Sequence, residues 1–274
     1  MGGKATVVTA YYPIKSKHPK RKYIEWICDF WPATSCQLVF FTEPAIASEL
    51  QQVLMCGGKR DASNTRIYGV PFKELSAFKK VPLSVWKWQM AMDPERDVHT
   101  AEVYALWFEK KEFVQRAIDA NPFGSECFVW CDAGICRSRE WSRNSQIVDN
   151  FPLENKIPRG QMLVLQMEHF FPEDFIPDSD GIYGDFTVGR TTVGGGILAS
   201  DVAGWKRWDV AYDAMVQKYY HADRFIGKDQ NIMGSMILAD STLALPVYSP
   251  TSLGAQSLIR WFYLLFFLSF GSQS

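Results

Sequence analysis

The chain has 274 residues and a mass of 31.3 kDa, which suits one large domain or two small ones at about 100–200 residues per domain. Hydrophobic residues make up 47% of it and charged residues 22%, so a disordered chain, a collagen-like fibre and a coiled coil are excluded. With 29 Lys and Arg against 30 Asp and Glu, the net charge is −1. There is no basic excess for binding nucleic acid.

Aromatic residues are frequent, with 10 Trp, 11 Tyr and 19 Phe. Such rings stack on sugars or bases, or they fill the core, and we favour the core. The six cysteines include no Cys-x-x-Cys pair and are too sparse for a disulfide scaffold, which indicates a reducing compartment. The first residues lack the apolar segment of a secretory signal, so we expect a cytoplasmic protein, with peripheral membrane attachment as the alternative.

Short β-rich runs and helical runs alternate over the first 70 residues. In chain order we expect a strand over Ala5–Tyr11, a helix over Lys20–Trp31, a strand over Gln37–Thr42, a helix from Glu43-Pro44 to Gly57-Gly58, and a strand over Thr65–Val70. Proline is favourable in the first turn of a helix and glycine just after its end. This β-α-β-α-β order is typical of a nucleotide-binding half-sheet.

The rest of the chain continues the alternation. We expect helices over Leu83–Met92 and Thr100–Ala120, strands over Glu126–Cys131, Met162–Gln166 and Val193–Ala199, and helices over Asp201–Tyr220 and Asp229–Leu238. The continuous apolar run before Asp132 indicates a buried central strand. The whole pattern predicts an α/β fold, with a mixed, mostly parallel central sheet flanked by helices.

The chain closes on an apolar run, Trp261–Phe270. This run is too short to cross a bilayer, which needs about 20 residues. We therefore expect no transmembrane segment here and a buried terminal helix or strand, with a membrane-surface anchor as the alternative.

Asp132 is the first candidate for chemistry, because it follows the predicted central strand. A carboxylate there lies at the sheet edge where open α/β folds bind ligands, and it can ligate a divalent cation that bridges a diphosphate. Gly134 would allow close backbone approach, and Arg137 and Arg139 suit phosphate. The alternative is a simple turn between two elements.

Two further segments interrupt the pattern of their elements. Gly194, Gly195 and Gly196 weaken a strand, so a sugar or acceptor lies against them, or a bulge or close helix packing requires them. Asp229 is the helix N-cap, or it contacts a sugar hydroxyl or acts as the base, with Lys228 and Gln230 as donors near a helix end that favours anions.

Lys17 lies in a loop beyond the first strand, where ligand-binding residues are common. It also belongs to a basic run, whose simpler interpretation is a solvated charge cluster. The segments His99–Glu102 and Trp107–Lys111 are interpreted as structural, as a mixture of helix cap, core rings and solvated charges.

Taken together, these segments resemble the HtrL/YibB family, also called the WlaTC/HtrL-type glycosyltransferases. The resemblance runs from about residue 5 to 268, in the same order. It rests on Val8–Tyr12 with Ser16–His18, Val39–Thr42, Asp93–Glu95 with His99, Glu102, Tyr104 and Trp107, Asn121–Phe123, Val129–Gly134 with Arg137, Gly194–Gly196, and Gly227–Gln230.

The resemblance implies a single GT-A-like domain over residues 1–274, with a nucleotide-binding half at about 5–135 and an acceptor-binding half at about 136–270. It implies sugar transfer from a nucleotide sugar to a glycan or lipid-linked acceptor. The donor-binding residues would be Thr9, Ala10, Tyr11, Lys17, Asp132, Ala133, Gly134 and Arg137. The sugar and acceptor residues would be Gly194, Gly195, Gly196, Lys228 and Gln230, with Asp229 catalytic.

The metal question stays open at this point. Asp132 has the place of the Asp-x-Asp motif that holds Mn²⁺ or Mg²⁺ in GT-A enzymes, but Gly134 replaces the second carboxylate, and no histidine follows His221. Lys17, Arg137 or Arg139 would neutralise the diphosphate instead. Two other functions remain: a non-catalytic protein that binds a nucleotide sugar or glycan, and an unrelated nucleotide-dependent enzyme on the same scaffold.

Overall fold

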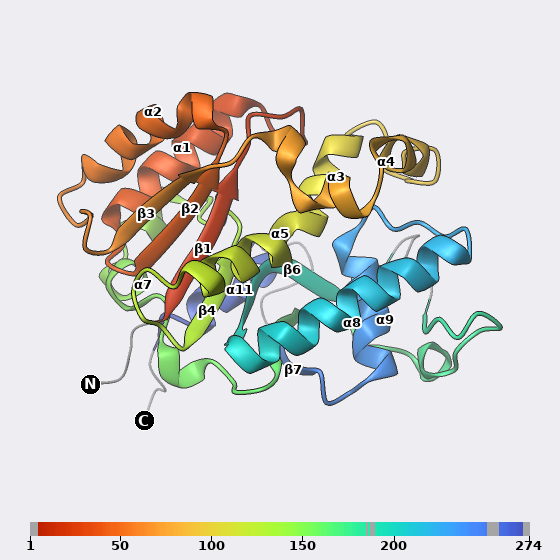
Figure 1. Cartoon of the computed structure of the whole chain (residues 1–274). Coiled ribbons are helices and arrows are strands. Elements are labelled where there is room, and N and C mark those ends of the chain that lie inside the picture. The colour runs from red at the N-terminus through yellow and green to blue at the C-terminus, as the bar shows by residue number, and fades with distance from the viewer. Residues whose placement is uncertain (1–4, 185, 187–189, 251–257, 271–274) are drawn as a thin grey trace.

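The computed structural model describes residues 5–184, 186, 190–250 and 258–270. Its centre is a seven-stranded sheet in the order β3-β2-β1-β4-β6-β5-β7 (Figure 1). The strands are β1 Thr6–Tyr11, β2 Gln37–Thr42, β3 Thr65–Gly69, β4 Cys127–Cys131, β5 Met162–Gln166, β6 Val193–Asp201 and β7 Ala244–Tyr248. The protein is a single α/β domain, and its sheet runs without a break through both predicted halves of the chain.

The sheet is mixed but mostly parallel. Strands β1, β2, β3 and β4 run parallel to one another, β5 runs parallel to β7, and β6 is antiparallel to both β4 and β5. The end of β4 therefore meets the beginning of β6, where the Asp132 amide donates a hydrogen bond to the Gly196 carbonyl at 2.8 Å. Because β1 and β4 are parallel, the carboxyl end of β1 lies at the same end of the sheet as this meeting point.

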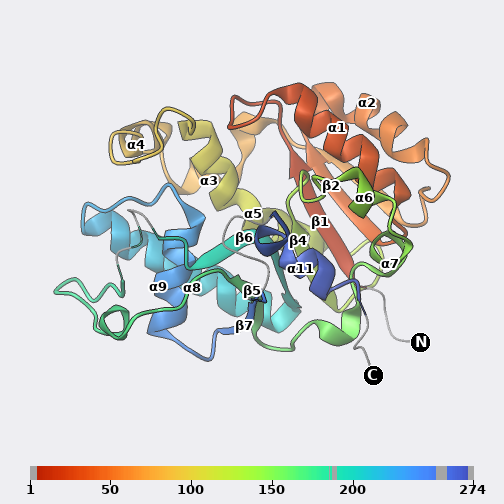
Figure 2. The same ribbon diagram turned by 180° about the vertical axis from the view of Figure 1, so that it is seen from behind.

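Helices cover both faces of the sheet. They are α1 Lys20–Phe30, α2 Pro44–Met55, α3 Ser76–Lys80, α4 Leu83–Gln89, α5 Ala101–Ala120, α6 Arg139–Ser142, α7 Ser145–Asn150, α8 Val202–His221, α9 Asp229–Ala239, α10 Leu258–Trp261 and α11 Tyr263–Phe267. One face packs against α5, α8 and α9, and the other against α1, α2, α7 and α11 (Figures 1 and 2). Trp31, Trp86, Trp205 and Trp208 are fully buried, so many of the rings do fill the core.

The predicted elements of the first 70 residues, the central strand and the long helices are all confirmed, within about two residues at each end. The short helices α3, α6 and α7 and the strand β7 were not predicted. Strand β7 contains Pro246, which weakens the sequence signal of a strand; β7 lies at the sheet edge, where proline is tolerated.

The apolar run near the end of the chain is part of the core, as predicted. It forms α11 and the end of α10 rather than one continuous helix, and Leu264, Leu265 and Leu268 are buried beneath the sheet face that carries α1. Within the described residues, no helix combines the length and the hydropathy that a membrane crossing requires.

One predicted detail is wrong. Asp229 is the first residue of α9 and not its N-cap; Lys228 has the N-cap position, and no side chain caps that end. The Asp229 carboxylate instead accepts a hydrogen bond from Lys110 of α5.

Candidate functional site

Two adjoining cavities, of about 240 and 510 Å³, open at the sheet edge where β1 and β4 end and β6 begins. The smaller lies against the end of β1 and Tyr23 of α1. The larger lies against the glycines of β6 and the first turn of α9. The residues common to both are Lys17, His99, Trp107, Lys110, Asp132, Arg137 and Phe262.

The cavities bring together nearly all of the predicted site residues, from both halves of the chain. Ala10, Tyr11, Lys17, Asp132, Ala133, Gly134 and Arg137 line the smaller cavity. Gly194, Gly195, Gly196, Lys228, Asp229 and Gln230 line the larger one. Thr9 is the exception: it is fully buried within β1 and lines neither cavity, so its expected contact with a donor finds no support in the fold.

A buried lysine joins two of the candidate carboxylates. Lys110 projects from α5 with a side chain only 8% exposed, and its Nζ lies 2.8 Å from Asp229 Oδ2 and 3.4 Å from Asp132 Oδ1. The same ammonium donates a hydrogen bond to the Gly195 carbonyl at 2.9 Å. Lys110 thus ties α5 to β6, to α9 and to the residue after β4. Lys110, Asp132 and Asp229 are called the Lys110 cluster.

The Lys110 cluster holds one ammonium and two carboxylates, so its formal charge is −1 when all three groups are ionised. Although the Asp132 side chain is 43% exposed, the protein packed around its carboxylate desolvates it and raises its pKa, and the nearby Asp229 charge raises the pKa further. Lys110 and the Trp130 indole N–H, 2.9 Å away, act in the opposite direction. The two carboxylates raise the pKa of Lys110 despite its burial. The cluster therefore keeps its ammonium and has capacity for one more proton.

Gly195 makes room for this arrangement. A Cβ atom at position 195 would lie 2.6 Å from Asp229 Oδ2, closer than any side-chain carbon tolerates, whereas one at Gly196 would meet only Ile135 at 3.3 Å and Asp132 at 3.7 Å. The pairing of β5 with β6 also shifts between Leu163 and Leu165. Close helix packing and a strand irregularity, both expected as alternatives, occur here beside the cavity.

Two basic side chains at the cavities have no carboxylate partner. Among the described residues, neither Lys17 nor Arg137 has an acidic oxygen within 4.0 Å. The Arg137 guanidinium lies between the rings of Trp26 and Phe262, at 4.7 and 4.9 Å from their centroids, and burial lowers its pKa. Arg139, the other candidate, is exposed, pairs with Asp29 at 3.2 Å and lines neither cavity.

Lys228 differs from these two, because its ammonium lies 3.0 Å from Glu95 Oε2. Both residues line the larger cavity. Its charge is thus already balanced by a carboxylate, which makes Lys228 a hydrogen-bond donor rather than a free cation.

Three cavity residues, Lys110, His99 and Trp107, were interpreted from the sequence as structural. His99 Nδ1 lies 2.9 Å from Oδ2 of the buried Asp93, an oxygen that also accepts the Tyr104 hydroxyl at 2.6 Å. A signal for Lys110 was present in the sequence: it falls on the same helical face as Val103, Trp107 and Val114. A lysine on the apolar face of a helix needs a buried partner.

The residues at Asp132 do not fit a resident divalent cation. Gly134 supplies no second carboxylate, and the Lys110 ammonium lies within 3.4 Å of both Asp132 and Asp229. A cation bridging those two carboxylates would meet this positive charge. The binding and acid–base chemistry of the site therefore falls to the protein's own side chains.

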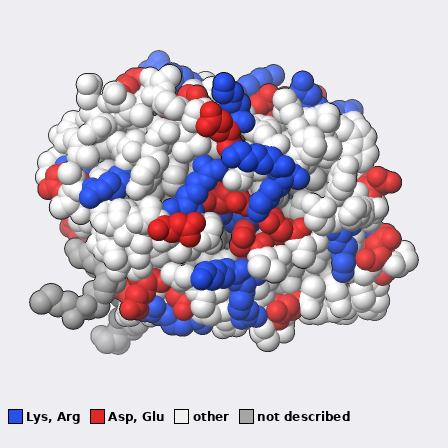
Figure 3. All heavy atoms as spheres, viewed as in Figure 1, with Lys and Arg blue, Asp and Glu red and all other residues white. Residues whose placement is uncertain are grey.

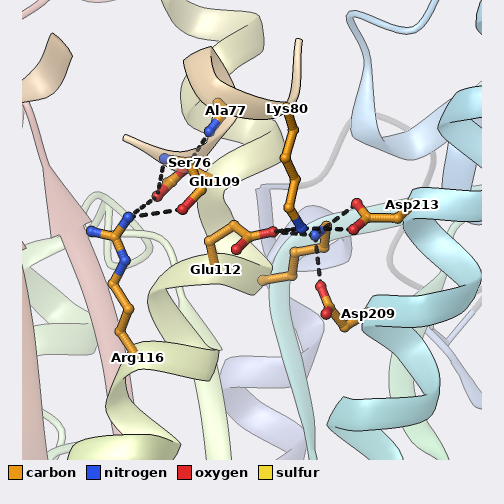
Figure 4. A network of polar contacts seen from close by, with 9 residues as sticks. Ser76, Ala77, Lys80, Glu109, Glu112, Arg116, Asp209 and Asp213 are labelled. Atoms are coloured by element: carbon orange, nitrogen blue, oxygen red, sulfur yellow. Dashed lines mark hydrogen bonds and ion pairs between the residues drawn. The ribbon is translucent and has the colours of Figure 1, made fainter. Parts of the chain in front are cut away.

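A separate acidic group lies on the outer side of α5. Acidic and basic side chains gather together over α5 and α8 (Figure 3), and carboxylate oxygens of Glu112, Asp209 and Asp213 lie within 4.8 Å of one another. Two ammonium groups already bridge them: Lys111 contacts all three, and Lys80 lies 2.6 Å from Glu112 and 2.7 Å from Asp213 (Figure 4). These five residues are called the Lys111 cluster below.

No protein-family model matches the chain, and no curated protein sequence matches it. Any assignment of function therefore rests on the geometry and chemistry of the cavities.

Proposed function

We propose that the protein transfers a sugar from a nucleotide-sugar donor to a hydroxyl acceptor. One observation carries the proposal: Lys17 and Arg137, two basic side chains with no carboxylate partner in the described part of the chain, share a cavity with the Lys110 cluster. Cations lacking a protein counter-ion suit a diphosphate, and a carboxylate with capacity for a proton suits a reaction at a hydroxyl. A nucleotide sugar needs both kinds of group a few ångströms apart.

The smaller cavity suits the nucleoside. It lies at the carboxyl ends of parallel strands in a β-α-β-α-β unit, where α/β proteins bind nucleotides. Tyr23, whose ring centroid lies 5.9 Å from that of the buried Tyr11, forms part of its wall and offers an aromatic ring to a base. Lys17 and Arg137 line both cavities, so a diphosphate held by them would lead from the smaller cavity to the larger.

The larger cavity suits the sugar and the acceptor. Gly196, the partly exposed glycine of β6, leaves its backbone open to a sugar ring, and Gln230 and Lys228 provide hydrogen-bond donors. Trp261, which is 42% exposed, lines the same cavity and offers an indole face to an acceptor sugar or an apolar acceptor chain.

Asp132 belongs on the sugar side of this arrangement. Without a cation between them, an ionised carboxylate and a diphosphate repel each other, so Asp132 would not contact the phosphates directly. Its side chain is 43% exposed while that of Asp229 is 7% exposed. We therefore give the acid–base role to Asp132; Asp229, the residue that the sequence suggested, positions Lys110 and raises the pKa of Asp132.

The reaction follows from these placements. The acceptor oxygen bonds to the anomeric carbon of the donor while the bond from that carbon to the diphosphate oxygen breaks. The acceptor proton passes to the Asp132 carboxylate, and the charge on the leaving nucleoside diphosphate is met by Lys17 and Arg137. Besides the two substrates, this step uses only the side chains of Asp132, Lys17 and Arg137.

We further propose a reducing compartment such as the cytoplasm. All six cysteines are free, and Cys28 and Cys56 are exposed. In an oxidising compartment, exposed thiols tend to form disulfides.

A thermal-shift screen of nucleoside diphosphate sugars, with and without Mn²⁺, tests the binding proposal. A matching donor at 100 times its Kd adds about 2.7 kcal/mol to the free energy of unfolding. Arg137→Gln is expected to lose that shift, and Arg139→Gln is the matched control that keeps it. Failure of every nucleotide sugar to raise the melting temperature would overturn the proposal; binding without any sugar transfer would leave a nucleotide-sugar binding protein.

A further inference from the structure

We propose that the Lys110 ammonium takes the place of a divalent cation between Asp132 and Asp229, so that the site works without a metal ion. Both carboxylates are contacted by the same nitrogen, at 3.4 and 2.8 Å. They come from opposite halves of the chain, one after β4 and the other at the start of α9. One centre of positive charge thus joins them, as a bridging cation would.

Lys110 is held in this position from several sides. Its side chain is 8% exposed, and the Gly195 carbonyl accepts its third contact at 2.9 Å. The lysine stands in the middle of the twenty-residue helix α5, which packs on β1 and β4. A metal ion could enter only if a buried, multiply bonded ammonium left, and a buried charge without its partners is costly.

This arrangement also divides the electrostatic roles in the cavity. An ammonium carries one positive charge where a divalent cation carries two, so the Lys110 cluster stays at −1 and cannot attract a diphosphate. The diphosphate then depends on Lys17 and Arg137, which have no carboxylate partners among the described residues. This inference rests on the proposed function, because Lys110 can replace a metal ion in sugar transfer only if the protein transfers a sugar.

A Mn²⁺ titration followed by electron paramagnetic resonance tests the inference without measuring activity. The wild-type protein is compared with Lys110→Met, which removes the charge and keeps an unbranched side chain, and with Lys110→Met combined with Asp132→Asn. We expect the single variant to gain one Mn²⁺ site, at least about tenfold tighter than any wild-type binding that depends on Asp132. The double variant is expected to lose the gained site.

Two outcomes would overturn the inference. One is a wild-type Mn²⁺ site that disappears in Asp132→Asn; the other is a folded Lys110→Met protein that gains no site. Melting curves establish folding, and Lys110→Gln replaces Lys110→Met if the latter unfolds. Thermal shifts with nucleotide sugars, recorded on the wild type without metal, are a separate measurement. Their absence would overturn the proposed function, while the Mn²⁺ titration alone tests whether Lys110 occupies the position of a divalent cation.

Discussion

Lys110 and Lys111 are neighbours on α5, and each holds a cluster of carboxylates: Lys110 points toward β6 and α9, and Lys111 points toward α8. Lys111 is 3% exposed and faces α8, where it lies 2.6 Å from Asp209 and 2.9 Å from Asp213 (Figure 4). Lys110 is 8% exposed and faces the sheet edge. Burial is thus similar for the two lysines, and Lys111 contacts three carboxylates where Lys110 contacts two.

Formal charge does not separate the two clusters either. The Lys111 cluster has two ammonium groups and three carboxylates, and the Lys110 cluster has one and two, so each carries −1. The difference is space: the Lys110 cluster lines a cavity beside three glycines and two cations that have no carboxylate partner among the described residues, whereas the Lys111 cluster holds α3, α5 and α8 together. A buried ion cluster becomes a candidate site only where a ligand can reach it.

The largest expected effect breaks the structural cluster. Lys111→Met would leave Glu112, Asp209 and Asp213 facing one another with one ammonium fewer. Removing one partner of a fully buried ion pair costs about 3–5 kcal/mol. Because the three carboxylates are 13–34% exposed and two of them keep Lys80, we expect a loss of about 2–3 kcal/mol in denaturant unfolding. Lys79→Met, an exposed lysine nearby on α3, is the control and should change little. A loss below about 1 kcal/mol in Lys111→Met would show that its contacts do not hold these helices.

Glu109 extends the comparison to a third buried charge on α5. Its carboxylate accepts the amides of Ser76 and Ala77 and pairs with Arg116 at 2.9 Å, yet burial raises its pKa from 4.5 to about 7. Between pH 4.5 and about 7, the folded protein therefore keeps a proton on Glu109 that the unfolded chain has released. Stability should fall as pH rises from 4.5 to about 7, by on the order of 3 kcal/mol.

Unfolding curves recorded across that pH range measure this slope. Glu109→Gln cannot titrate and should flatten it. An equal slope in Glu109→Gln would assign the pH dependence to other groups.

Gly195→Ala sharpens the comparison on the cavity side. The new Cβ would lie 2.6 Å from Asp229 Oδ2 and push that carboxylate away from Lys110. We expect sugar transfer to fall about tenfold or more, because displacement of a positioning group by about 1 Å is costly. Gly196→Ala, with its nearest atom 3.3 Å away, leaves Asp229 in place and measures separately the cost of a Cβ on the backbone that faces the sugar. Equal rates in the two variants would contradict a positioning role for Asp229.

A smaller and more specific effect concerns pH. Asp132 must be ionised to accept a proton, so activity should rise with pH through its raised pKa. The Asp229 charge contributes to that raised pKa, so Asp229→Asn should move the acid limb of the pH–rate profile to lower pH. Asp213→Asn, in the Lys111 cluster, should leave the limb in place. A limb that stays fixed in Asp229→Asn would contradict the coupling of the two carboxylates.

The fold was largely readable from the sequence because its strands are buried on both faces. Continuous apolar runs such as Gln37–Thr42 and Cys127–Cys131 have few other interpretations. Asp132 and the glycines of β6 were found as candidates for a related reason, since a polar or small residue next to such a run is conspicuous. β7 was missed because Pro246 interrupts its pattern.

The helical part of the site was harder to predict. Asp229 matches a local N-cap pattern, but its partner Lys110 is 119 residues away in the chain, and no local pattern reports such a contact. His99 and Lys110 were classed as structural because charged and aromatic residues alternate around them. Which face of a helix meets a cavity depends on tertiary packing, and this decides the role of those residues.

Turnover of a nucleotide sugar by Asp132→Asn, beside Asp213→Asn, tests the central claim most directly. The two variants remove one carboxylate from each cluster and should bind the donor as the wild type does. We predict that Asp132→Asn loses at least about 10²-fold in the rate of sugar transfer, while Asp213→Asn keeps the wild-type rate. A wild-type rate in Asp132→Asn, with the donor still bound, would contradict the assignment of the Lys110 cluster as the reacting site.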